Sequence, residues 1–344
     1  SELIANQKPP IWTVKDYIEA GSLVSIIGAP GSGKTFLALD IGLHVAAGKN
    51  CHGLPVIQGL VLYVCGEGKS GIGRRIDALC RENNIARETL PFFVSTIPAQ
   101  LLDKMSLAEV TAAAIEIMLK YGKPALIIID TLNRNFGDGD ENSTADMTRF
   151  IGSVDQLRSS FGCAVLVVHH TGIGAKDRGR GSTALRGAID FEYLVTQTGR
   201  PRDNVRLIRM EAKKVKDFES PPILTFEPVV VDLGIFDEEG SPVTSLALRL
   251  TNTPSGSRTN AGRMTMAMRI ALDGLKVVAD ESGQATLDDW RKAAYANKIS
   301  KSEKQDTKQK AFNRAKDNLL EDGLIGIEGD KFYIVSQDTG QTGQ

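Results

Sequence analysis

The chain has 344 residues, a length that predicts one large domain and a smaller second one. Hydrophobic residues make up 42% and charged residues 24%, which is typical of a soluble globular protein and excludes a largely disordered chain. The formal net charge of −1 excludes a general attraction to nucleic acid, membrane surfaces or acidic partners, so any nucleic-acid site must be local.

Apolar runs are short throughout the chain. The longest, such as 125–129, fall far below the roughly 20 residues that span a bilayer, so we expect no membrane segment. The four cysteines, Cys51, Cys65, Cys80 and Cys163, contain no CxxC pair, and the four histidines complete no zinc spacing. We therefore expect reduced thiols in a cytoplasmic protein.

From residue 21 to about residue 250, short β-rich runs alternate with helical patterns, which predicts an α/β fold with a mostly parallel sheet covered by helices. The expected strands are 22–27, 60–65, 91–95, 125–130, 164–169, 191–196, 205–211 and 223–228. The expected helices are 34–47, 71–84, 106–121 and 146–161. The last three strands follow one another without helices, so we expect them to be antiparallel.

The remainder of the chain predicts a second domain. Helical patterns precede an apolar run in which Gly329 and Asp330 predict a β-hairpin. Three helices, at 264–279, 286–296 and 303–321, followed by a two-stranded wing at 324–335, predict a winged helix. The expected division is a lead-in at 1–20, an ATPase domain at 21–250, a Thr-, Ser- and Gly-rich linker at 251–262, a winged-helix domain at 263–336 and a flexible tail at 337–344.

A glycine-rich loop between the first long strand and the first helix matches the pattern GxxxxGK[ST], in the context that this pattern needs. Its glycines let backbone N–H groups turn inward around phosphate oxygens, and the helix adds its positive end. Lys34 would neutralise the β/γ oxygens and Thr35 would ligate Mg²⁺, so we expect ATP and Mg²⁺ as cofactors. The expected nucleotide-binding residues are Gly28, Ala29, Pro30, Gly31, Ser32, Gly33, Lys34, Thr35 and Phe36.

Two acidic residues follow strands that end at the same edge of the expected sheet. Asp130 closes the strand 125–130, where its carboxylate would hold Mg²⁺ as a Walker B residue. The alternative is that Asp130 caps a turn with Thr131. Glu67 lies between two glycines after the strand 60–65, from which it could deprotonate the attacking water. The alternative is a solvated loop glutamate.

His169 closes the strand 164–169 and His170 follows it directly, so they could sense the nucleotide through its γ-phosphate. Since side chains alternate along a strand, one of the two should pack inward, and His170 is the expected sensor. Ordinary hydrogen-bonded histidines are the alternative.

The stretch 172–181 is rich in glycine and basic, and in a ring it could line the pore and contact single-stranded DNA through Lys176 and Arg178. A solvated surface loop is the alternative. Several basic residues after it could reach the γ-phosphate bound by a neighbouring subunit. These candidates for a trans-acting finger are Arg180, Arg186, Lys213 and Lys214.

Residues 298–316 carry seven basic and two acidic side chains, a local net charge of +5. A helix of this kind in a helix-turn-helix module can lie in a major groove or along phosphates, with Lys308, Lys310 and Arg314 as the candidate DNA-binding residues. The alternative, to which we give equal weight, is a protein contact or a solvated basic face.

Together, WTVKDYIEAGSLVSIIGAPGSGKTFLALDIGLHVAAG, VLYVCGEG, ALIIIDTLNR and VLVVHHTG followed by RGSTALRG resemble the RepA-type hexameric replicative helicases of plasmids and phages. The resemblance covers about 10–228 and implies a RecA-like P-loop core, a homo-hexamer and single-stranded DNA as partner. It also implies a primase or polymerase module, either upstream or in trans. The roles that it implies are nucleotide and Mg²⁺ binding for Lys34 and Thr35, base for Glu67, Walker B carboxylate for Asp130, sensor for His170 and trans finger for Arg180.

The expected function is an ATP-dependent DNA helicase motor for plasmid, phage or mobile-element replication, which hydrolyses ATP at subunit interfaces and moves along single-stranded DNA. One alternative is a RecA-like DNA-dependent ATPase, of the RadA or KaiC type, that loads or remodels without unwinding. The other is an ATP-switched regulator that binds a specific duplex through its winged helix.

Overall fold

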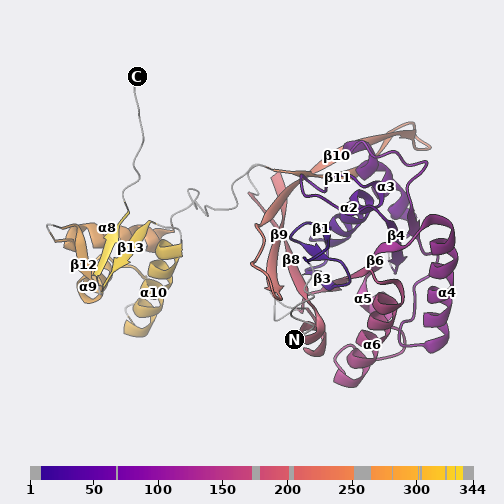
Figure 1. The fold of residues 1–344 in the computed structure, drawn as a ribbon. Coiled ribbons are helices and arrows are strands. Elements are labelled where there is room, and N and C mark those ends of the chain that lie inside the picture. The colour runs from indigo at the N-terminus through magenta and orange to yellow at the C-terminus, as the bar shows by residue number, and fades with distance from the viewer. Residues whose placement is uncertain are drawn as a thin grey trace. The chain divides into compact units, whose positions relative to one another are not determined.

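A computed structural model describes residues 9–66, 69–172, 179–200, 205–251, 265–280, 282–300, 302, 304–321, 324–329 and 331–335. The chain divides into two compact units, Ser1–Thr253 and Pro254–Gln344, here called the N-terminal and C-terminal units (Figure 1). In the part of the chain that is described, no helix combines the length and the apolar character needed to cross a bilayer.

A nine-stranded sheet runs through the N-terminal unit in the order β11-β10-β9-β8-β3-β7-β6-β4-β5. The strands from β8 to β5 in this order are parallel to one another, and β9, β10 and β11 extend the sheet antiparallel. Their bounds are β3 (Leu23–Gly28), β4 (Leu60–Cys65), β5 (Phe92–Val94), β6 (Pro124–Asp130), β7 (Ala164–His170), β8 (Phe191–Arg200), β9 (Val205–Val215), β10 (Leu224–Phe236) and β11 (Pro242–Leu250). The short strands β1 (Trp12–Val14) and β2 (Ile18–Glu19) form a separate pair.

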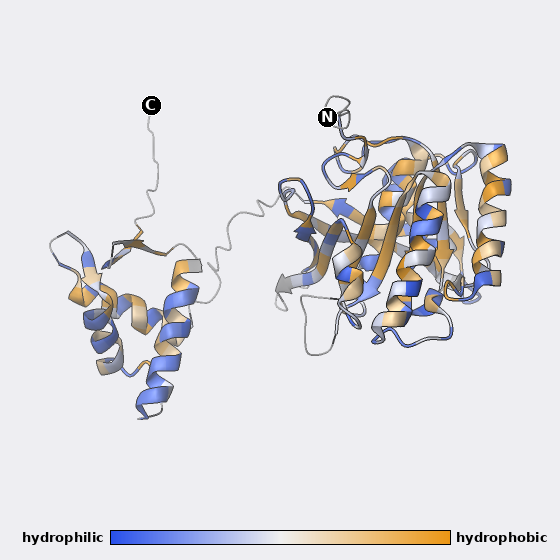
Figure 2. Ribbon diagram, turned by 60° about the horizontal axis from the view of Figure 1, so that its bottom comes forward, coloured by the Kyte–Doolittle hydropathy of each residue, from blue (hydrophilic) through white to orange (hydrophobic). Residues whose placement is uncertain are grey.

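Helices cover both faces of the parallel part of the sheet (Figure 1). Alternate strand residues belong to two different hydrophobic cores: Val61 and Tyr63 pack with α2 and α3, whereas Leu62 and Val64 pack with α4 to α7. Because both faces are buried, these strands are nearly continuous apolar runs, which appear orange in Figure 2. The helices are α2 (Lys34–Ala47), α3 (Lys69–Glu82), α4 (Lys104–Tyr121), α5 (Leu132–Phe136), α6 (Thr144–Phe161) and α7 (Ala184–Ala188).

The helix ends follow local sequence signals. Asp103 and Ser143 accept hydrogen bonds from the backbone N–H groups of the first turns of α4 and α6. Gly48 and Gly162 adopt left-handed conformations directly after α2 and α6, where a glycine carries no steric penalty. The expected long helices therefore begin and end within a few residues of those in the structure.

The C-terminal unit has its own core. Its elements are α8 (Met266–Val278), β12 (Gln284–Thr286), α9 (Leu287–Ala296), α10 (Gln305–Glu321), β13 (Ile325–Glu328) and β14 (Lys331–Ile334). The three strands form an antiparallel sheet in the order β12-β14-β13. Trp290 is fully buried at the centre, contacts the rings of Phe312 and Phe332, and donates a 2.6 Å hydrogen bond from Nε1 to the Ala271 carbonyl.

The part of the main sheet from β8 to β11 differs in part from the sequence-based expectation. The strands β8, β9 and β10 are antiparallel to one another, as expected, but β8 also pairs in parallel with β3, because the short helix α7 lies in the connection from β7. The strand β11 was not expected. Most of its residues are exposed or half-buried, so its apolar pattern is weak, and it is recognisable only through its pairing with β10 along the sheet edge.

Candidate functional site

Parallel strand register brings the expected site residues to one edge of the sheet. Gly28 at the end of β3 lies opposite His170 at the end of β7. Asp130 at the end of β6 lies opposite Val168 of β7 and Cys65 of β4. Backbone hydrogen bonds join the segments that follow, from Thr171 N to Gly28 O (3.1 Å) and from Gly66 N to Asp130 O (2.6 Å). The glycine loop and the Asp130 carboxylate therefore share the carboxyl edge of the sheet.

The loop between β3 and α2 has the conformation that its glycines permit. Gly31 and Gly33 have φ values of 74° and 100°, which side-chain-bearing residues rarely adopt. A Cβ on Gly28 would collide with the Val195 carbonyl oxygen of β8, so the loop starts directly against that strand. The side chain of Gln197 donates a 2.6 Å hydrogen bond to the Gly31 carbonyl and holds the loop from the same strand.

Lys34 is buried at the start of α2. Its Nζ donates hydrogen bonds to the carbonyls of Gly28 (2.9 Å) and Ala29 (2.8 Å), so the ammonium group lies within the curve of the loop. Gly33 is the N-cap of α2 and no side chain caps that helix, which leaves backbone N–H groups of the first turn available for an anion. Thr35 follows at the helix start and is half-buried.

The other expected nucleotide-binding residues differ in how exposed they are. Ala29 and Pro30 are exposed at the loop tip, and Ser32 is buried beneath it. Phe36 is half-buried, with the guanidinium group of Arg75 5.1 Å from the centre of its ring. Phe36 therefore contributes to the packing of α2 against α3 rather than lying open at the sheet edge.

Asp130 is only 4% exposed. The Tyr63 hydroxyl, from the neighbouring strand β4, donates a hydrogen bond to its Oδ2. Burial, together with the charge and hydrogen bond of Asp130, raises the pKa of Tyr63 well above its ordinary value, so Tyr63 remains a donor. Sequence reasoning missed Tyr63; the available signal was a lone polar group within an apolar strand that ends at this edge.

The two histidines take different positions. His169 is buried, and its Nε2 donates a 2.6 Å hydrogen bond to the Arg180 carbonyl. Burial lowers the pKa of His169, although the bond to Arg180 partly opposes that shift, which favours the neutral imidazole. His170 is partly exposed at the same strand end, and its carbonyl accepts a 2.8 Å hydrogen bond from Arg180 N.

Arg180 forms an ion pair with Glu141, which lies in the loop before α6. The Arg180 side chain is 46% exposed, whereas that of Glu141 is 10% exposed. The Glu141 carbonyl accepts a 2.9 Å hydrogen bond from Ser182 N, and a Cβ on Gly181 would collide with it. The segment that carries Arg180 is therefore held by Glu141 on one side and by the end of β7 on the other. Glu141 had no sequence motif to identify it.

Two of the other finger candidates, Arg186 and Lys214, lie close to this segment. Arg186 forms an ion pair with Glu192 (3.1 Å), and Lys214 donates hydrogen bonds to the carbonyls of Arg186 (2.7 Å) and Gly187 (3.3 Å). Lys213 pairs with Glu211 at 2.7 Å on β9. Arg180, Arg186 and His169 line one small hollow of about 80 Å³.

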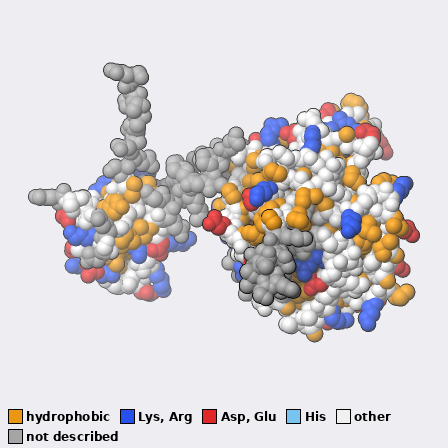
Figure 3. Space-filling model, viewed as in Figure 1, with side chains coloured by type: hydrophobic (Ala, Val, Ile, Leu, Met, Phe, Trp, Pro, Cys, Tyr) orange, Lys and Arg blue, Asp and Glu red, His pale blue; other side chains and the backbone are white. Residues whose placement is uncertain are grey.

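Three expected residues, Glu67, Lys176 and Arg178, lie outside the described residues. The expected duplex-binding residues Lys308, Lys310 and Arg314 lie on α10 of the C-terminal unit. Lys310 and Arg314 are exposed, Lys308 is half-buried, and Lys310 forms a 2.8 Å ion pair with Asp306. On the visible face of the N-terminal unit, basic and acidic side chains are interspersed (Figure 3).

Two comparisons with known proteins indicate what the chain is similar to. A family model described as an AAA domain matches residues 1–176, just over half of the chain, which include the glycine loop and Asp130. Among solved structures, the crystal structure of the RadB recombinase is similar, with a TM-score of 0.43 and 15% identity over 60% of this chain and 87% of that chain. The chain therefore belongs to the AAA domain family, and its core is a P-loop ATPase core.

Proposed function

We propose that the protein is an ATP-dependent DNA helicase motor that acts as a homo-hexamer in plasmid, phage or mobile-element replication. The observation that carries the proposal is the meeting of the Lys34 loop, the Asp130 carboxylate and the histidine pair at one sheet edge. This arrangement combines a loop suited to binding an anion, a buried carboxylate and a polar strand end. The exposed Arg180 is hydrogen-bonded to that strand end.

The residues present fit ATP with Mg²⁺. The backbone N–H groups of 29–35 and the Lys34 ammonium would hold the phosphates, and the Thr35 hydroxyl and Asp130 would hold the cation. When bound, ATP and Mg²⁺ supply a phosphoanhydride whose negative charge is partly neutralised. Lys34 would exchange its contacts with the carbonyls of Gly28 and Ala29 for phosphate oxygens. We assign Glu67 as the base that takes a proton from water.

Arg180 is the residue that we assign as the trans-acting finger. Its side chain is nearly half exposed, and its backbone N–H and C=O bond both histidines at the end of β7. A change at His170 would therefore reach Arg180 through one backbone hydrogen bond, and a change at His169 through its side chain. Arg186 is ion-paired within the subunit and exposed to the same degree as Arg180, so the choice of Arg180 rests on its hydrogen bonds to the two histidines, whereas Lys214 is held by backbone carbonyls.

Two features support action on DNA. The basic residues Lys176 and Arg178 belong to the segment directly after β7, so a loop that contacts single-stranded DNA would start at the proposed sensor His170. In the C-terminal unit, the order helix, strand, two helices and two strands supports a winged helix at 263–336. Its helix α10 would offer Lys308, Lys310 and Arg314 to a duplex.

The proposal is tested with a forked DNA duplex that carries both single-stranded tails, using wild type and Lys34→Ala. ATP-dependent strand separation by the wild type alone is the expected result. ATP hydrolysis that DNA stimulates without strand separation would instead support a loader or remodeller. Sequence-specific retention of duplex with negligible hydrolysis would support an ATP-switched regulator.

A further inference from the structure

Four side chains with metal-binding donor atoms lie close together, two on α2 and two in the turn that follows it. Asp40, His44, Cys51 and His52 each place one donor atom within 4.8 Å of the others, and we call them the α2 cluster. The sequence contains no standard zinc spacing here, because two of the residues lie on a helix and two in the turn after it.

The fold explains how these residues meet. Asp40 and His44 are four residues apart on α2 and so share one face of the helix. Gly48, with φ of 65°, ends the helix, and Cys51 and Leu54 exchange backbone hydrogen bonds of 2.8 and 2.9 Å. This tight turn directs Cys51 and His52 back toward α2.

The α2 cluster is buried and polar. None of its four side chains is more than 7% exposed. The Asp40 carboxylate contacts His52 Nε2, His44 Nδ1 (3.5 Å) and Asn83 Nδ2 (3.0 Å), with no lysine or arginine among its ion-pair partners in the described ranges. A buried carboxylate is costly unless it is neutralised, and a cation shared with the two imidazoles and the thiol would do so.

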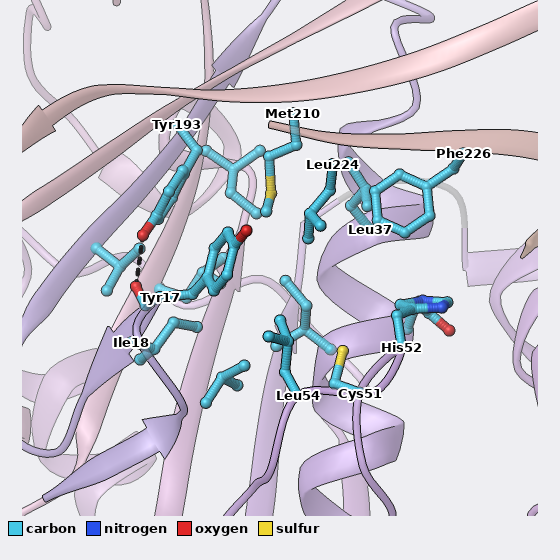
Figure 4. A pocket seen from close by; sticks show the side chains of 16 residues that line it. Tyr17, Ile18, Leu37, Cys51, His52, Leu54, Tyr193, Met210, Leu224 and Phe226 are labelled. Carbon is cyan, nitrogen blue, oxygen red and sulfur yellow. Dashed lines mark hydrogen bonds and ion pairs between the residues drawn. The ribbon is translucent and has the colours of Figure 1, made fainter. Parts of the chain in front are cut away.

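The surroundings suit a bound ion. On one side the cluster borders a surface hollow of about 430 Å³ lined by His44, Lys49, Asn50, His52 and Asn83, which offers an entry path. On the other side Cys51 and His52 stand at the end of an apolar pocket with Leu54, Leu224 and Phe226 (Figure 4). A polar entrance backed by an apolar wall is the environment of many buried metal sites.

We propose that Asp40, His44, Cys51 and His52 bind one Zn²⁺ ion. Two nitrogens, one carboxylate oxygen and one sulfur form a closed tetrahedral donor set of the structural type. Zinc bonds of about 2.0–2.3 Å would require the donor atoms to lie roughly 3.3–3.8 Å apart, which small shifts of the turn can supply. Cys51 would bind as the thiolate, and its proton would pass to the solvent.

The ion would fasten the turn at 48–54 to α2, and Asn83 would hold Asp40 from the end of α3. The site is separate from the nucleotide loop, since Asp40 lies six residues beyond Lys34, about 9 Å along the helix. The proposal therefore does not depend on ATP hydrolysis or on action on DNA.

The test uses full-length protein without an affinity tag, stripped of metal by a chelator and then titrated with Zn²⁺ against a chromophoric competitor. Co²⁺ provides a second readout, because a tetrahedral site with a thiolate gives intense visible bands and a sulfur-to-cobalt charge-transfer band. Cys51→Ser is the test variant. Cys163→Ser is the matched control, since Cys163 is also buried but belongs to the opposite core.

We expect one equivalent of Zn²⁺ to bind wild type and Cys163→Ser and to raise their melting temperatures. Cys51→Ser should lose the charge-transfer band and bind Zn²⁺ at least about tenfold more weakly. Absence of stoichiometric Zn²⁺ on the wild type, or a Co²⁺ spectrum that Cys51→Ser leaves unchanged, would overturn the proposal. The cluster would then be a hydrogen-bonded Asp–His network without a metal.

Discussion

The hydroxyl of Tyr63 donates a hydrogen bond to the carboxylate of Asp130 across the neighbouring strands β4 and β6. Both residues are buried, and burial and the Asp130 charge keep the tyrosine pKa well above its ordinary value. The Tyr63 hydroxyl thus orients the carboxylate that we expect to bind the metal, as hydrogen-bond partners of metal ligands commonly do.

Tyr63→Phe should raise the Mg²⁺ concentration needed for half-maximal ATP hydrolysis by about tenfold, because the oriented carboxylate loses its donor. The free energy of unfolding should fall by about 1–3 kcal/mol, the cost of leaving a buried acceptor without this partner. Mg²⁺ titrations and urea unfolding measure the two effects. Tyr193→Phe is the control, since its hydroxyl bonds the Tyr17 carbonyl at 2.6 Å in the same core. An equal change in Mg²⁺ dependence in both variants would contradict the assigned role of Tyr63.

Gly28→Ala should destabilise the N-terminal unit by about 1–3 kcal/mol, because the new Cβ would collide with the Val195 carbonyl and push the loop from β8. Gly152→Ala, on α6 with open space around it, should instead stabilise by about 0.5–1 kcal/mol. Urea unfolding of both variants measures the difference. If Gly28→Ala were as stable as wild type, the close approach of the loop to β8 would be wrong.

Lys34→Ala should abolish nucleotide binding, since the loop would lose its only buried ammonium among the described residues. Glu67→Gln should bind ATP normally but hydrolyse it about 10²- to 10⁴-fold more slowly, the usual contribution of a general base. A fluorescent ATP analogue measures binding and phosphate release measures turnover. Wild-type turnover by Glu67→Gln would refute the assignment of the base.

His169 predicts a pH dependence of stability. Because burial lowers its pKa from 6.5 in the folded protein, the unfolded chain binds the proton more readily. The His169 contribution to stability is therefore complete above about pH 6.5 and decreases as the pH falls toward the lower, folded pKa. Urea unfolding between pH 8 and about pH 5 should show this loss in wild type, and His169→Gln should reduce the slope. An identical slope in the variant would show that other groups cause it.

Much of this fold follows from local patterns. The GxxxxGK[ST] loop, the apolar strand that ends in Asp130 and the helical periods all depend on neighbours in sequence, and the sequence predicted their positions closely. The parallel pairing of β8 with β3 was not predicted, because strand direction depends on how the chain crosses the sheet after α7.

Contacts between segments that lie far apart in the sequence could not be predicted from local patterns of this kind. Tyr63 meets Asp130 only through the register of β4 and β6, and Arg180 meets Glu141 only after the segment following β7 folds back. The same holds for the α2 cluster, where a turn rather than a spacing brings Cys51 and His52 to the helix. These partners depend on tertiary geometry, which local residue patterns do not encode.

The most direct test of the proposed motor is steady-state ATP hydrolysis with and without single-stranded DNA, at protein concentrations that span assembly. We predict strong stimulation of wild type by DNA and its loss in Arg180→Ala. Arg149→Ala, which removes an exposed arginine paired with Asp146 on α6, should behave like wild type. ATP hydrolysis that DNA does not change, or an Arg180→Ala variant with full stimulation, would contradict a DNA motor that hydrolyses ATP at its subunit interfaces.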